Sequence, residues 1–198
     1  MCVAAGDGRE PFMPNTMKNI RETMVKQGIS DEIMTQLPFD GENNLEDILT
    51  LIDQMDKLLS EEQRLAIMGQ QGCCTTGRHA AFHRDFAQRN ADKSLLEKIE
   101  LSGELFFVDE PPCRLNEDGT LTVFWSSGED GAYRCVCGYM KSMEQPMRIS
   151  PTFCGCCGAH ARKNLQRSLG VKLTLKQIVS SAASTGGEKR CEFLYDIN

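Results

Sequence analysis

Hydrophobic residues in the first half of the chain recur at the spacing of amphipathic helices. The clearest stretch follows Asn44, where apolar residues repeat at i, i+3 and i+4 and therefore share one helix face. They are Leu45, Ile48, Leu49, Ile52, Met55, Leu58 and Leu59. Ser60, with Gln63 three residues later, has the sequence of a capping box, so a second helix is predicted to begin there.

Four more helices are predicted in this half. The first begins at Asn15 or Thr16 and ends at Gly28, because glycine suits the position that follows a helix. The others are a short turn of helix over residues 30–37 and helices over about 76–88 and 92–101. The inner face predicted for the first helix carries Met17, Ile20, Met24 and Val25.

The pattern changes after residue 101. Residues 105–108 and 121–125 are short, rich in aromatic and β-branched residues and separated by turn-forming residues, so both are predicted strands. We expect Cys135 and Cys137 at the end of a third strand.

The C-terminal stretch predicts a helix followed by a hairpin. The helix runs from near Cys154 to Leu169 and stops at Gly170. Apolar and polar residues then alternate over 171–179 and again over 191–197, as two half-buried strands require, with glycines in the turn between them. Ala161, Leu165 and Leu169 form the apolar stripe of this helix that is expected to face the core.

Together these elements predict an α+β fold. A helical N-terminal region, residues 1–101, is expected to pack against a cysteine-rich domain, residues 102–198. That domain is predicted to hold an antiparallel sheet, one long helix and a terminal β-hairpin.

The composition is that of an ordinary globular protein. A chain of 198 residues, 40% hydrophobic and 25% charged, can bury a core without covalent staples. The start has no basic stretch before an apolar run, and no segment approaches the apolar length that spans a bilayer. We therefore expect a cytoplasmic protein with no membrane contact. Nothing in the pattern specifies an oligomeric state.

The net charge of −6 belongs to the first half of the chain. Residues 1–100 carry 11 Lys/Arg against 17 Asp/Glu, whereas residues 101–198 carry 11 of each. Within the second half, residues 145–191 hold eight basic residues and one acidic residue, Glu188, which could attract an anionic ligand. Aromatic residues are not interleaved there for base stacking, so a solvated face is favoured and no nucleic acid is expected.

Cysteines are the most informative residues of the chain. Most of the ten fall in three clusters, each followed within three residues by a glycine. The clusters are Cys73-Cys74, Cys135-Val136-Cys137 and Cys154-Gly155-Cys156-Cys157. In a reducing compartment such clusters favour metal binding or catalysis over a disulfide framework.

The spacing within the clusters suits a soft metal. Several thiolates must converge on a zinc ion, and short spacings reduce the entropy lost in bringing two of them together. Cys135 and Cys137 would leave the same face of a strand, and Gly138 would let backbone amides turn towards the sulfurs. Cys154, Cys156 and Cys157 are expected at a helix start, where the dipole and free amides lower a thiol's pKa.

The predicted metal site therefore consists of Cys135, Cys137, Cys154 and Cys156, joined by Cys73 or Cys74. Zinc is favoured over an iron-sulfur cluster. Either Cys154 or Cys157 is expected to belong only to the core, as is Cys191, while Cys113 is left open.

Two histidine patterns offer alternatives. Cys156 or Cys157 could pair with His160 as a catalytic nucleophile, although neighbours on one helix splay apart, so metal binding is preferred. His79 and His83 have the i, i+4 spacing of a chelating pair, but solvated surface residues are the favoured interpretation.

The C-terminal third resembles a known group of domains. Residues 150–158, the helix that follows and residues 184–193 are similar to the close of 4-vinyl-reductase-type domains and of related cysteine-rich bacterial proteins. The resemblance implies an α+β domain that binds small hydrophobic molecules, with cysteines holding a metal. Cys157 and His160 stand where the relatives have other residues, so neither inherits a role.

We therefore predict a cytoplasmic metal-binding protein that acts as a small-molecule-binding or sensing module, with a hydrophobic or anionic ligand. The alternative is an enzyme, either a cysteine-dependent hydrolase of a small amide or thiazoline-type substrate or a cluster-dependent reductase.

Overall fold

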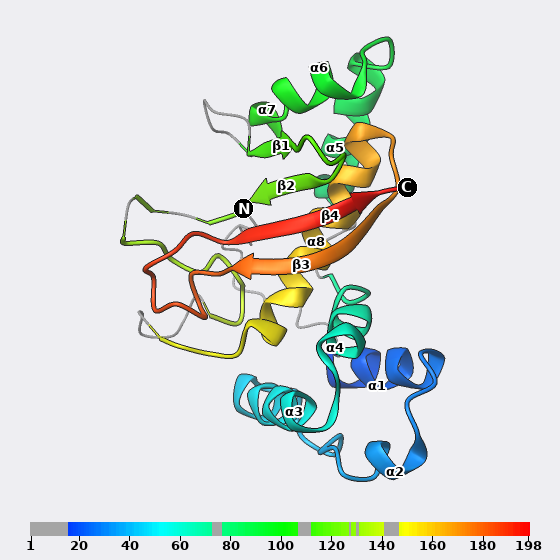
Figure 1. The fold of residues 1–198 in the computed structure, drawn as a ribbon, viewed down its shortest axis with the longest axis vertical. Helices are drawn as coiled ribbons and strands as arrows, with labels where there is room; N and C mark the ends of the chain where they lie inside the picture. The colour runs from blue at the N-terminus through cyan, green and yellow to red at the C-terminus, as the bar shows by residue number, and fades with distance from the viewer. Residues whose placement is uncertain (1–15, 73–76, 107–111, 127, 130, 141–146) are drawn as a thin grey trace.

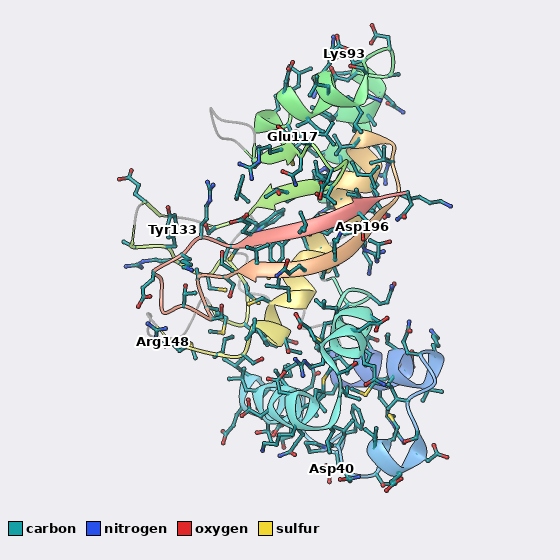
Figure 2. The ribbon with its side chains drawn as sticks, viewed as in Figure 1. Asp40, Lys93, Glu117, Tyr133, Arg148 and Asp196 are labelled. Carbon is teal, nitrogen blue, oxygen red and sulfur yellow. The ribbon has the colours of Figure 1, made fainter. Side chains whose placement is uncertain are left out.

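The computed structural model describes residues 16–72, 77–106, 112–126, 128–129, 131–140 and 147–198. Its fold is α+β, as predicted, with helices at both ends of the long axis and an antiparallel sheet between them (Figure 1). Asp40 and Lys93 mark the two opposite ends (Figure 2).

Four helices form the N-terminal end. They are α1 (Thr16–Lys26), α2 (Asp31–Met34), α3 (Leu45–Leu58) and α4 (Glu61–Met68). The side chains of Ser30, Asn44 and Ser60 each accept a hydrogen bond from a backbone N–H of the following turn, and Ser60 with Gln63 completes the predicted capping box.

The predicted buried face of α1 is wrong at one residue. Met17, Ile20 and Met24 are buried, but Val25 is 64% exposed, because α1 buries only a narrow stripe of its surface.

Three further helices lie at the opposite end: α5 (Gly77–Arg89), α6 (Leu95–Glu100) and α7 (Gly103–Phe106). The strand predicted over residues 105–108 is wrong for its first two residues, which belong to α7. Backbone hydrogen bonds from Glu104 to Leu101 and from Leu105 to Ser102 continue the turn that closes α6, so the chain coils where an extended strand was expected. The other two residues lie outside the described part of the chain.

The sheet has the strand order β1-β2-β4-β3 and is antiparallel throughout. Its strands are β1 (Cys113–Leu115), β2 (Leu121–Phe124), β3 (Leu173–Ser180) and β4 (Glu192–Ile197). The predicted hairpin is the β3–β4 pair. Register shifts after Leu175 and after Ile178 break the alternation in β3, which leaves Val179 45% exposed.

The long helix α8 (Pro151–Leu169) covers one face of the sheet (Figure 1). It ends at Gly170, whose φ of 75° is the left-handed conformation that glycine adopts without strain. The predicted stripe of Ala161, Leu165 and Leu169 is buried. Tyr195 of β4 is fully buried and donates its hydroxyl to the Gly158 carbonyl at 2.8 Å.

The same helix also joins the N-terminal helices to the sheet. Thr152 donates to Asp56 at 2.6 Å, and the Arg64 guanidinium lies 3.2 Å from the same carboxylate. Lys163 donates to the carbonyls of Gln70 and Gln71, which follow α4, at 2.8 and 2.6 Å. One cluster of buried apolar residues runs through both halves of the chain.

Crossing a bilayer would require a longer and more apolar helix than any found in the described residues.

Gly155→Ala tests the close approach of α8 to α4. A Cβ at Gly155 would lie 2.5 Å from the Cβ of Met68, and neither atom can rotate away. Overpacking costs about 1–3 kcal/mol and the gain in helix propensity is at most about 1 kcal/mol, so we expect a net loss of roughly 1–2 kcal/mol in unfolding free energy. Chemical denaturation measures it.

Gly138→Ala is the matched control, since a Cβ there meets nothing within 4 Å. Equal stability of the two variants would contradict the proposed packing.

Candidate thiol site

Cys135 and Cys137 lie in irregular chain, which corrects the prediction of a third strand. Within residues 131–140, β-type pairing is limited to one isolated β-bridge at Arg134. A turn follows at residues 138–140. Tyr133 donates its backbone N–H to Gly187 and thereby ties this loop to the β3–β4 connection. Figure 2 shows Tyr133 on the side of the molecule where β2 ends and β4 begins.

Backbone amides of this loop affect the ionisation of its cysteines. Interaction with the backbone N–H groups of Tyr139 and Met140 lowers the pKa of Cys137, and interaction with the Cys137 N–H acts in the same direction on the pKa of Cys135, where burial outweighs it. The Met140 N–H donates to the Cys137 carbonyl at 3.0 Å and closes the turn at residues 138–140. That Gly138 lets amides face the sulfurs stays a prediction.

Cys157 of α8 also affects the ionisation of Cys137. A hydrogen bond with the Cys157 thiol is the largest cause of the lowered pKa of Cys137, ahead of the opposing effect of burial. The same interaction raises the pKa of Cys157 well above the ordinary thiol value, and burial raises it further. The pKa values of the two thiols therefore shift in opposite directions.

Three other cysteines near this pair favour the neutral form. Burial raises the pKa of Cys135 to about 12 and also raises the pKa values of Cys154 and Cys191. Cys154 donates to the Ser181 hydroxyl at 3.1 Å, and the Cys191 sulfur accepts the backbone N–H of Ala182 at 3.4 Å.

The expectation that a helix start would lower the pKa of the last cluster is therefore wrong for Cys154 and Cys157. The helix begins at Pro151, so Cys157 lies beyond the first turn and its free amides. Cys154 is almost completely buried, and desolvation outweighs any benefit from the dipole.

The fold brings six cysteines close enough to influence one another's ionisation. Charge on Cys137 affects Cys135, Cys154, Cys157 and Cys191, and charge on Cys156 affects Cys137 and Cys157. Four of the predicted ligands, Cys135, Cys137, Cys154 and Cys156, thus lie in one region. Cys113 of β1 is outside this set, and burial raises its pKa to about 12.

The sulfurs are near one another but do not form a preassembled ligand shell. In the part of the chain that the structure describes, no group of three or more His, Cys, Asp or Glu side chains is placed to hold a metal ion. Cys73 and Cys74 lie outside those residues, so their predicted role stays a prediction. The preceding residue, Gly72, packs on α8, where a Cβ would lie 3.1 Å from the backbone of Ala159 and His160.

His160 is buried on α8. Arg167 donates to Asn164 Oδ1 at 3.0 Å, which leaves the Asn164 amide N–H₂ to donate to His160 Nε2 at 2.9 Å. The ring also packs edge-on against Trp125, with centroids 5.1 Å apart. Nε2 is engaged as an acceptor, and a catalytic pairing of Cys156 with His160 stays a prediction.

His83 is buried, so its interpretation as a solvated surface residue is wrong. Its Nδ1 lies 2.6 Å from the Ser168 hydroxyl, in the contact between α5 and α8. The side chain of His79 lies outside the described residues.

Tyr139 is a residue that the sequence analysis missed. Its hydroxyl lies 2.8 Å from Thr16 Oγ1 at the start of α1 and also hydrogen-bonds the Asn43 side chain. Asn43 has a φ of 65° and accepts the Met17 N–H at 2.9 Å. Tyr139 follows Cys137 by two residues, and this proximity to a predicted ligand was the only sequence signal. It connects the cysteine loop to the N-terminal helices.

A cavity of about 60 Å³ lies between α4, β3 and the start of α8, lined by residues that include Arg64, Leu65, Thr152 and Ile178. Its volume is well below that of pockets for organic ligands. The predicted small hydrophobic ligand stays a prediction.

Comparison of the chain with models of known protein families, with curated proteins and with solved structures found no significant match. The resemblance to 4-vinyl-reductase-type domains therefore also stays a prediction, and the functional inference rests on the geometry of the thiol site.

Cys157→Ala should raise the pH midpoint for alkylation of Cys137 in metal-free protein. The substitution removes the largest cause of the lowered pKa, so a higher pH is needed to form the thiolate. Alkylation rates at Cys137, followed by peptide mass spectrometry across a pH series, measure the shift. Cys113→Ala, on β1, should leave the midpoint unchanged, and an unchanged midpoint in Cys157→Ala would refute the assigned contact.

Tyr139→Phe and Thr16→Val each remove one side of the same hydrogen bond. Each should lower the unfolding free energy by about 1 kcal/mol, and the double variant should lose about as much as one single variant. Chemical denaturation of the wild type, the two single variants and the double variant completes this double-mutant cycle. Strict additivity of the two losses would show that the hydroxyls do not interact.

Proposed function

We propose that this protein binds a soft metal ion, zinc in the first instance, at a thiolate site centred on Cys137. Cys135, Cys154, Cys156 and Cys157 are the candidates for the remaining sulfur ligands. The observation that carries the proposal is the gathering of these cysteines, from the loop at residues 131–140 and from α8, around Cys137, the one of them whose pKa is lowered despite burial.

Hydrogen bonds from backbone amides are what a metal-bound thiolate needs from its surroundings. Groups around the ligands orient them and compensate their charge, and they contribute to affinity almost as the ligands do. Backbone N–H groups lower the pKa of Cys137 and oppose the effect of burial at Cys135, so amides near both sulfurs favour the thiolate form that a metal needs. This feature supports ligation by Cys135 and Cys137.

The chemistry of the neighbourhood fits a soft ion. The interactions described around these sulfurs include other thiols, backbone amides and the Ser181 hydroxyl. Thiolates select zinc, copper(I) or iron-sulfur clusters over magnesium and calcium. A colourless zinc site remains favoured over an iron-sulfur cluster.

Binding would require the sulfurs to close on the ion, because the described residues hold no preassembled group of three. Several of these cysteines are neutral thiols, so metal uptake should release protons and strengthen as the pH rises. Cys154 is the least suited ligand, since its thiol already donates to Ser181 in a nearly fully buried position.

A binding or sensing module is the role that best fits this placement. The cysteine loop contacts α1 through Tyr139 and Thr16, and α8 through Cys137 and Cys157. A structural change in the cysteine loop would therefore reach both the N-terminal helices and the sheet domain directly. Reduced thiols of this kind suit the cytoplasm, where we place the protein.

Metal analysis of protein purified without oxygen or chelator tests the proposal. We expect about one zinc per chain in the wild type, as for a single structural or sensory site. Cys137→Ser should lose most of this zinc, whereas Cys113→Ser, at a cysteine outside the set, should retain it. The proposal fails if wild-type protein contains no metal and takes up none when zinc is added, or if Cys137→Ser binds zinc as the wild type does. Visible absorbance from bound iron would instead favour the cluster.

A further inference from the structure

The sheet has one face covered by α8, and the strands lie in front of that helix in the view of Figure 1, where no described helix crosses the opposite face. Phe193 packs against α8, and Val123 and Cys113 share its row across the strands. Successive side chains of a strand point to opposite faces. Arg114 and Phe124, which follow two of these residues, therefore point to the open face.

Two arginine side chains meet the same aromatic ring on this open face. The guanidinium carbon of Arg190 lies 3.5 Å from the centroid of the Phe124 ring, and that of Arg114 lies 5.7 Å from it. The two guanidinium carbons therefore cannot lie farther apart than the sum of these distances. Arg114 belongs to β1 and Arg190 directly precedes Cys191 at the start of β4, with β2 between the two strands, so packing brings them together.

Both arginines are exposed, and the ion pairs found among the described residues include neither of them. Arg114 Nε donates to the Asn116 side chain at 3.3 Å, which fixes one edge of its guanidinium group and directs the other elsewhere. Arg190 rests on the face of the Phe124 ring. A guanidinium group stacked in this way keeps its N–H groups in its own plane, where they can donate in pairs to one phosphate.

The rest of the open face limits the size of the anion that fits. Glu192 is the cross-strand partner of Phe124, and Asp196 farther along β4 is paired with Lys176 at 3.0 Å. An extended polyanion would have to pass these carboxylates, whereas a single phosphate group would not. Leu194 is half-buried between Glu192 and Asp196 and offers apolar surface for the organic part of a ligand.

We propose that Arg114 and Arg190, oriented by Phe124, bind the phosphate group of a small organic phosphate monoester. The phosphate bridges the two guanidinium groups, and the organic part lies on the ring and on Leu194. This inference goes beyond the thiol site and does not depend on it, because none of these side chains is a candidate metal ligand.

Phenyl phosphate is the probe, and isothermal titration calorimetry of the full-length protein at neutral pH and low salt measures its affinity. Phenyl sulfate has the same ring and a single negative charge, so it is the comparison ligand. We expect phenyl phosphate to bind about tenfold more tightly, because its second charge and oxygen engage the second arginine.

Arg114→Gln and Arg190→Gln should each weaken the binding of phenyl phosphate about tenfold, since each removes a charged donor pair. Glu192→Gln should strengthen binding about twofold, because it removes a negative charge from the same face. Lys172→Gln is the matched control. It removes one exposed positive charge just before β3, whereas Arg190 lies beside Ser180 at the other end of that strand, so it should leave the affinity unchanged.

Phe124→Leu tests the orienting role of the ring. Leucine keeps the position apolar but cannot hold a guanidinium group over a flat face, so the preference for phenyl phosphate over phenyl sulfate should fall severalfold. Loss of contact with the organic ring affects both ligands alike. The ratio of the two affinities therefore reports on the arginines.

The inference is overturned if the wild type shows no saturable binding of phenyl phosphate, if the arginine variants bind it as the wild type does, or if Lys172→Gln weakens binding as much as they do. Tighter binding of a single-stranded oligonucleotide, lost in the same variants, would overturn the assignment to a small ligand. Thermal unfolding confirms that each variant is folded. Should Phe124→Leu fail to fold, the arginine variants and the charge control decide. The arginine variants leave every cysteine in place, so the outcome is separate from that of the metal analysis.

Discussion

The seating of α8 on the sheet is the contact on which the rest of the structure depends. Tyr195 donates its buried hydroxyl to the Gly158 carbonyl, and the absence of a side chain at Gly158 lets the helix approach Leu175 and Phe193, where a Cβ would lie 3.0–3.2 Å away. The same helix meets α4 at Gly155. Because Cys154, Cys156 and Cys157 occupy its first two turns, any shift of α8 would move three of the gathered sulfurs together.

The cysteine thiols gathered around α8 differ in how readily they ionise. Burial raises the pKa values of Cys135, Cys154 and Cys191, while the effects of the Cys157 thiol and of nearby backbone N–H groups outweigh burial and lower the pKa of Cys137. The difference arises from partners rather than from exposure, since Cys135 and Cys137 are 9% and 8% exposed. The proposed metal site draws on this asymmetry, because ligation needs one sulfur that favours the thiolate form and others near it.

Much of the fold could be predicted from local pattern. The capping residues Ser30, Asn44 and Ser60, the end of α8 at Gly170 and the β3–β4 hairpin follow from short-range chemistry that is present in the sequence. Predictions failed where a distant contact or a local turn overrode the pattern. Leu105 and Phe106 continue a helical turn, and Val179 is turned outwards by register shifts.

The sequence by itself determined the α+β class, the approximate positions of most helices and of β2, β3 and β4, and which cysteines stand beside turn-forming glycines, but it did not predict β1. It could not determine which cysteines gather, because the loop at residues 131–140 and helix α8 are separate elements that only packing brings together. It also carried no signal that Tyr139 would reach Thr16 or that His83 would be buried against Ser168. Periodicity and capping act over a few residues, whereas the partners that set a thiol's ionisation are gathered by the tertiary fold.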